Sequence, residues 1–107
     1  MEGMEQISFQ MIAAIGEGRS KIMLAMNEAA EGHFEEANKL LQESNQSLVK
    51  AHESHFGLIQ KEANGEKVEL GLLFMHAEDQ LMTTSLLKDM AEQMVKMYEK
   101  LHKISEG

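Results

Sequence analysis

Two glycine-containing breaks divide the pattern of apolar and polar residues into three long stretches. The breaks are Glu31-Gly32-His33 and Asn64-Gly65-Glu66. Each places a glycine just past a helical pattern, where a left-handed residue commonly ends a helix. The stretches are about 28, 31 and 37 residues long, or roughly 40 to 55 Å if fully helical. We predict three antiparallel helices joined by two turns.

The first two stretches are amphipathic, because apolar and small residues recur along one face at spacings of three and four. Gly16 and Gly18 weaken the first helix by ~1 kcal/mol each relative to alanine. This favours a close helix–helix approach or a local break there over a backbone anion site. The face comprises Ile7, Met11, Ala14, Gly18, Ile22, Ala25 and Ala29 in the first stretch, and Phe34, Ala37, Leu41, Ser44, Leu48, His55 and Ile59 in the second.

The third stretch carries two apolar stripes. Between Leu70 and Leu87 only Glu78 and Asp79 are charged, and a helix that is apolar all round is buried on all sides. Two partner helices cover one face only, so we predict that the second stripe packs against other copies of the chain. The first stripe is Leu70, Leu73, Ala77, Leu81, Thr84, Leu87, Ala91, Val95 and Tyr98; the second is Leu72, Met75, Asp79, Met82, Leu86, Met90, Met97, Leu101 and Ile104.

The composition favours one all-α domain over residues 1–107. The chain has no proline and only 5% aromatic residues, which disfavours a β-sandwich or barrel. It has no cysteine, which excludes disulfides, thiolate metal sites and a cysteine nucleophile of its own.

Charge and hydropathy exclude two classes of partner. With 10 basic and 18 acidic residues the net charge is −8, which opposes binding to nucleic acid and to anionic membranes. The start of the chain is acidic where a signal peptide would be basic. The uncharged run from Leu70 to Ala77 is far short of the ~20 apolar residues that cross a bilayer. We expect a cytoplasmic protein with no direct membrane insertion.

A small polar cluster interrupts the second stripe. Asp79 lies between Met75 and Met82, and a buried carboxylate must be paired, protonated or metal-bound. His76, Gln80 and Thr83 share a face with it at helical spacing. Neutral imidazole is a nucleophile, and phosphoryl transfer needs mainly positioning and charge stabilisation. The cluster is therefore either a phosphoryl-transfer site with His76 as nucleophile or a set of polar interface groups.

The other histidines predict no second site. His52 and His55 lie three residues apart on the second helix, where hydrogen-bonded core histidines are favoured over a metal pair. Glu99 and His102 match the Glu-x-x-His motif of di-iron bundles, but those proteins need the motif twice. His33 lies at a helix start.

The stretch Met75-His76-Ala77-Glu78-Asp79-Gln80-Leu81-Met82-Thr83-Thr84, followed by Leu86-Leu87-Lys88-Asp89, resembles the signature of the IIA component of the lactose/cellobiose class of the bacterial phosphoenolpyruvate-dependent sugar phosphotransferase system. The resemblance covers essentially the whole chain. It includes Gln6-Ile7-Ser8-Phe9, Gly16 to Ser20, Ala51-His52 and Gln60-Lys61-Glu62-Ala63-Asn64-Gly65-Glu66.

This resemblance implies a homotrimer of antiparallel three-helix bundles that acts as a cytoplasmic phosphocarrier. The family's phosphorylated histidine falls on His76, which would accept a phosphoryl group from HPr and pass it to a cysteine of the IIB component during sugar uptake. The family's metal-binding aspartate falls on Asp79, which implies one divalent ion per trimer, Mg²⁺ as usually described. The alternative, from another class, is a non-catalytic helical oligomerisation protein.

Two positions depart from the family pattern, and a third bears on the positive charge that one of them lacks. Gln80 stands where members often have histidine, and Glu78 where they often have glutamine. Gln80 can donate a hydrogen bond to a phosphoryl group but cannot carry positive charge. Arg19 either supplies that charge or is a surface residue. The sugar stays open among lactose, cellobiose, chitobiose and other β-linked saccharides, and one carboxylate per subunit selects weakly among divalent ions.

Overall fold

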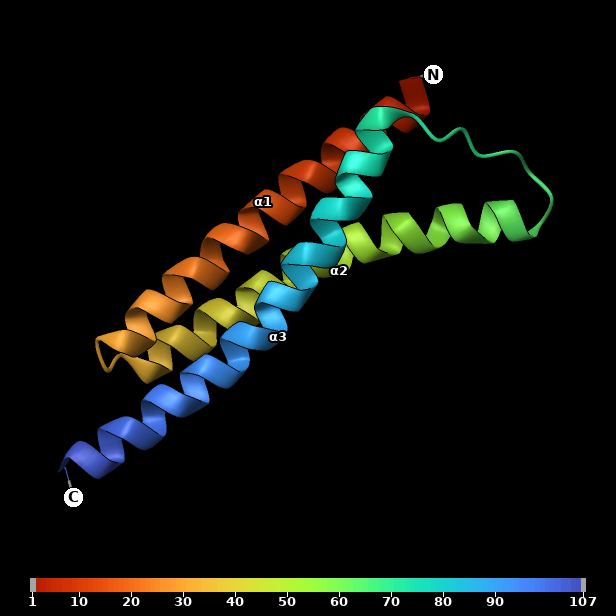
Figure 1. Cartoon of the computed structure of the whole chain (residues 1–107). Coiled ribbons are helices and arrows are strands. Elements are labelled where there is room, and N and C mark those ends of the chain that lie inside the picture. The colour runs from red at the N-terminus through yellow and green to blue at the C-terminus, as the bar shows by residue number, and fades with distance from the viewer. Residues whose placement is uncertain (1, 107) are drawn as a thin grey trace.

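The computed structural model describes residues 2–106, apart from the side chain of Glu2, and contains three long helices. They are α1 (Glu2–Ala30), α2 (Phe34–Ala63) and α3 (Leu72–Glu106), and within residues 2–106 all regular structure is helical. α1 and α3 run side by side in one direction and α2 runs against them (Figure 1). The all-α, antiparallel three-helix prediction is confirmed. None of these helices has a segment that is both long and apolar enough to span a bilayer.

Both predicted glycine turns have the same hydrogen-bonded geometry. Gly32 and Gly65 each have a φ of +85°, which glycine adopts without steric cost. After α1, the amide of His33 donates to the carbonyl of Glu28 at 2.9 Å. After α2, the amide of Glu66 donates to the carbonyl of Lys61 at 3.0 Å. Each bond closes a Schellman motif, which satisfies carbonyls that the helix end would leave unpaired.

The third helix starts later than the apolar pattern predicts. Residues 66–71 are not helical, and the first helical hydrogen bond of α3 runs from the amide of Met75 to the carbonyl of Gly71. The end of α2 lies away from the start of α3 (Figure 1), so the chain needs an extended connection, and six extended residues span up to roughly 20 Å. Leu70 is therefore exposed in this connection and does not belong to the helical stripe.

The core lies between the inner faces of the three helices, as the stripes predict. Alanines are prominent in it, and they allow the helix backbones to approach closely. Near the C-terminal end of α2 and in the first turn of α3 the buried positions differ from the prediction. Leu58 and Phe74 are buried, and Ile59 is exposed. The buried residues include Met11, Ile15, Ile22, Ala25, Ala29, Ala37, Leu48, Ala51, Ala77, Leu81, Ala91 and Val95.

The last twelve residues of α2, 52–63, diverge from α1 (Figure 1). We call this segment distal α2. Phe56 and Ile59 are exposed on it, whereas Leu58 lies with Phe74 of α3 and Val68 of the connection around a small depression. This divergence is the physical reason for the shift in buried positions, because distal α2 no longer faces α1.

One apolar face of α3 lies outside the bundle. Its eight apolar members, from Leu72 to Ile104, are between 55 and 85% exposed. We call these eight residues and Asp79 the α3 outer stripe. The prediction that α1 and α2 leave this stripe uncovered is confirmed. The apolar members are Leu72, Met75, Met82, Leu86, Met90, Met97, Leu101 and Ile104.

Gly16 and Gly18 in the middle of α1 have different surroundings, and α1 runs through both without a break. A Cβ atom on Gly18 would lie 3.3 Å from the side chain of Leu48 and from the backbone oxygen of Ser44. A Cβ atom on Gly16 would meet no atom within 4 Å. The predicted close helix–helix approach is therefore confirmed at Gly18, and it is wrong for Gly16 within one chain.

We expect Gly16→Ala to raise the free energy of unfolding by about 1 kcal/mol, because alanine is the better helix former and meets no neighbour. Gly18→Ala should instead lower it by about 1 kcal/mol, because overpacking against Leu48 and a backbone oxygen outweighs the same gain. Denaturant unfolding at one fixed chain concentration measures both. Equal stability of the two variants would contradict this account of the α1–α2 contact.

Candidate functional site

His76 and Asp79 lie in the first turns of α3, and both are exposed. Asp79 belongs to the α3 outer stripe between Met75 and Met82. Neither side chain takes part in a hydrogen bond or ion pair formed within residues 2–106. The imidazole of His76 is therefore accessible to a docking protein, which a histidine sealed inside the bundle would not be.

The two neighbours of His76 that share its face differ in what they offer a ligand. Gln80, one turn further along α3, is half-buried. The hydroxyl of Thr83 donates to the backbone carbonyl oxygens of Asp79 at 3.0 Å and Gln80 at 3.2 Å. A hydroxyl has one hydrogen to donate, so Thr83 is committed to the helix backbone. The predicted four-residue polar cluster thus reduces to His76, Asp79 and the amide of Gln80.

Glu78 belongs to a different contact. Its Oε1 pairs with Nδ1 of His55 on α2, and both side chains are partly buried. One turn away on α2, Nε2 of His52 lies 3.3 Å from Oγ of Ser85 on α3. These two contacts connect distal α2 to α3. Glu78 is thereby engaged with α2, on a different side of α3 from His76.

The predictions for the remaining histidines hold only in part. His55 is half-buried and hydrogen-bonded as expected, but His52 is exposed. His33 pairs with Glu28 at 2.7 Å, and His102 pairs with Glu106 at 3.1 Å. Within residues 2–106 no three metal-ligating side chains converge. A metal site is therefore not supported within a single chain.

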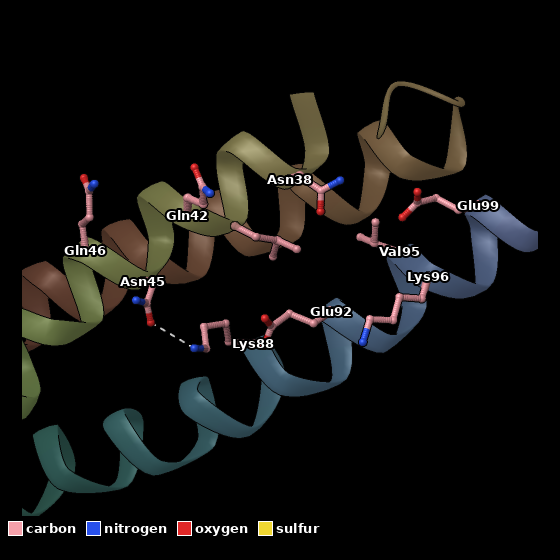
Figure 2. A pocket seen from close by; sticks show the side chains of 10 residues that line it. Asn38, Gln42, Asn45, Gln46, Lys88, Glu92, Val95, Lys96 and Glu99 are labelled. Atoms are coloured by element: carbon pink, nitrogen blue, oxygen red, sulfur yellow. Dashed lines mark hydrogen bonds between the residues drawn. The ribbon is translucent and has the colours of Figure 1, made fainter. Parts of the chain in front are cut away.

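Two further charged residues of interest lie elsewhere. Arg19 is exposed on α1, and no ion pair formed within residues 2–106 includes it. Glu99 lies in a polar groove of about 700 Å³ between α2 and α3. In this groove Nζ of Lys88 donates to Oδ1 of Asn45 at 3.0 Å (Figure 2). The groove is several turns along α3 from His76 and does not contribute to the candidate site.

Comparison with known proteins identifies the family. Residues 6–99 match the family model described as "PTS system, Lactose/Cellobiose specific IIA subunit". The chain belongs to this IIA family. The resemblance inferred from Met75 to Asp89 is thus confirmed over most of the chain.

Individual relatives of the IIA family agree with this assignment. The chain is 49% identical over 100 residues to the lichenan-specific phosphotransferase enzyme IIA component of Bacillus subtilis, covering 94% of this chain and 91% of that protein. The crystal structure of the cellobiose-specific enzyme IIA from Bacillus anthracis superimposes with a TM-score of 0.92 at 37% identity, covering 96% and 94% of the two chains.

A third relative is described together with a partner. The solution structures of a IIA(chitobiose)–HPr complex contain a chain that superimposes with a TM-score of 0.82 at 27% identity, covering 92% of this chain and 96% of that one. One protein of the same fold is therefore known in complex with HPr.

We expect Glu78→Ala to release distal α2 from α3. Loss of the partly buried pair with His55 should cost about 1 kcal/mol of local stability. Trypsin cleavage at Lys61 and Lys67 should then accelerate several-fold, which mass spectrometry of a digestion time course measures. Glu28→Ala removes the comparable pair with His33 at the other end of the bundle and serves as the control. The interpretation fails if both variants are cleaved at these lysines at the wild-type rate.

Proposed function

We propose that the chain is a cytoplasmic phosphocarrier that accepts a phosphoryl group from HPr on His76 and passes it to the IIB component during sugar uptake. The observation that carries the proposal is the exposure of this imidazole in a chain whose residues 6–99 match the IIA family. The name of the chitobiose relative, in complex with HPr, supports HPr as the donor. Relatives named for lichenan and cellobiose support a β-linked glucoside or a related saccharide as the transported sugar.

The transfer chemistry needs only one nucleophile from this chain. A ring nitrogen of His76 attacks phosphorus, and a nitrogen–phosphorus bond forms as the bond between phosphorus and the donor breaks. In the second step a thiolate of IIB attacks the same phosphorus and imidazole leaves. The chain has no cysteine, so the accepting thiol has to belong to another protein or domain. Positioning and charge stabilisation supply most of the catalysis in such a transfer.

The side chains that share a face with His76 on α3 are neutral or acidic and supply no positive charge. The amide of Gln80 can donate to a phosphoryl oxygen, since it takes no part in the side-chain hydrogen bonds formed within residues 2–106. Asp79, three residues from the histidine, repels a phosphoryl group of charge near −2 unless its own charge is offset. The proposal therefore includes a positive charge, close to Asp79, that offsets its carboxylate.

The α3 outer stripe supports self-association as a homotrimer. Eight large apolar side chains on one helix face form a surface larger than isolated exposed residues would make. A three-fold assembly around this face would bring together the Asp79 carboxylates of three copies. Oxygen ligands of this kind suit Mg²⁺, so Asp79 fits one shared ion per trimer, although one chain offers a single carboxylate. The ion would supply the counter-charge.

The second candidate function is a non-catalytic helical assembly protein. The same exposed stripe favours it, because self-association through this face needs no chemistry at His76. The two functions differ in phosphoryl uptake, which an assembly protein would not show.

We expect the chain to gain one phosphoryl group when incubated with phosphoenolpyruvate, enzyme I and HPr. The added mass should be labile to acid and stable to alkali, as a phosphohistidine is. His76→Gln should abolish the labelling, because an amide is not a nucleophile. His52→Gln, which changes another exposed histidine, should label normally. Persistent labelling of the His76 variant would show that another residue is the acceptor.

We expect Asp79→Leu to remove the bound divalent ion while the trimer survives, because an apolar axis needs no counter-charge. Metal analysis of the purified variant and sedimentation velocity measure the two effects separately. Glu92→Leu, on a different face of α3, is the matched control and should retain the ion. Unchanged metal content in the Asp79 variant would overturn the metal assignment. A monomeric wild-type chain at micromolar concentration would overturn the trimer.

A further inference from the structure

Four methionines dominate the middle of the α3 outer stripe. Met75, Met82, Met90 and Met97 follow one another at about two helical turns, and every one of them is more than half exposed. Their thioethers therefore reach solvent in the single chain. Leucine occupies other positions of the same stripe, so an apolar surface here does not by itself require sulfur.

Other methionines of the chain lie in contrasting environments. Met4 and Met11 are buried in the core, and Met11 is only 1% exposed. Met23 is 46% exposed on α1, outside the α3 outer stripe. Exposed thioethers are oxidised readily, whereas core thioethers are protected as long as the fold is intact. Met23 therefore serves as a control for the reactivity of an exposed methionine outside the stripe, and Met11 as a control for unfolding.

We infer that the methionines of the α3 outer stripe form an oxidation site that controls whether copies of the chain associate. This inference rests on the proposed trimer. The oxidant is a hydroperoxide such as hydrogen peroxide. The sulfur lone pair attacks one peroxide oxygen and the O–O bond breaks. A sulfur–oxygen bond forms and water leaves, so methionine is oxidised by two electrons and the peroxide is reduced.

Sulfoxides on this stripe have no hydrogen-bond donor within it. The other members are leucine, isoleucine and Asp79, and an ionised carboxylate only accepts. Thr83, beside the stripe, already donates to backbone carbonyls. Burial between copies would remove water from the new oxygens, and those out of reach of a donor beside the stripe, such as the Gln80 amide, would be left unsatisfied, which is costly. Oxidation therefore disfavours association.

Association should in turn protect the same sulfurs. When copies pack through the stripe, water and peroxide lose access to it, while Met23 on α1, outside the stripe, keeps its exposure. The oxidation rate of the stripe should consequently follow the fraction of dissociated chain. Because sulfoxides can be reduced enzymatically, the modification is reversible.

The experiment treats the full chain with hydrogen peroxide at several chain concentrations. Peptide mass spectrometry follows the addition of one oxygen to each methionine, and sedimentation velocity follows assembly. We expect stripe oxidation to slow as the chain concentration rises, and Met11 to stay unmodified. We also expect the oxidised chain to lose the trimer at a concentration where the untreated chain is assembled.

Two variants test the cause. Combined replacement of Met75, Met82, Met90 and Met97 by leucine conserves volume closely, and this variant should assemble both before and after peroxide. Met23→Leu should lose assembly on oxidation like the wild type. If the leucine variant does not assemble even untreated, single replacements of each methionine should each lower the sensitivity to peroxide.

The outcomes separate this inference from the proposed trimer. An untreated chain that is monomeric at every concentration overturns the trimer and the inference together. An untreated trimer that stays assembled with all four sulfoxides in place overturns the inference alone. Oxidation of Met11 as fast as the stripe overturns it as well, because dissociation would then follow from unfolding.

Discussion

The arrangement of the molecule depends on the burial of α3, a helix with apolar side chains on two sides. Its inner side packs on α1 and on the first part of α2, and this contact removes apolar area from water, which is the main favourable term in folding. Its outer side finds no partner within residues 2–106, because α1 and α2 cover only other sides of this helix. The bundle is therefore stabilised through one side of α3, while the apolar side chains of the other side stay exposed.

The candidate site lies where these two sides of α3 meet. His76 follows directly after Met75 of the outer stripe and precedes Ala77, which is fully buried. The imidazole is consequently held on a rigid helix whose inner side is packed, while the ring itself stays accessible. A rigid support with an exposed imidazole suits the proposed carrier role, since successive partners would have to reach the same atom. The carboxylate of Asp79 lies nearby. Association of several copies through α3 would therefore change the net charge around His76.

Much of this arrangement could be predicted from the sequence because it follows local rules. Gly32 and Gly65 end helices through backbone geometry that few other residues adopt, and the apolar periodicity identifies which faces are buried. The outer stripe was predictable as uncovered because two helices shield only one side of a third. His76 and Asp79 could be placed on α3 because both lie within its helical pattern of apolar residues.

The parts that could not be predicted depend on how the helices diverge in space. The non-helical connection over residues 66–71, the burial of Leu58 in place of Ile59 and the pairing of His55 with Glu78 all depend on the direction that distal α2 takes relative to α1 and α3. Helix periodicity carries no information about this angle. The hydrogen bond from the Thr83 hydroxyl to the helix backbone likewise depends on the rotamer of Thr83, which residue spacing does not specify.

The tight turn at Gly32 has a consequence for the order of folding. It connects α1 and α2 through three residues outside the helices, and their contact, including the close approach at Gly18, involves shorter sequence separations than the contact between α1 and α3. Contacts between neighbouring segments form before distant ones because they close smaller loops. The α1–α2 hairpin is thus favoured as the early nucleus, with α3 joining it last. During synthesis on the ribosome, α3, the helix that carries His76, would be the last to pack.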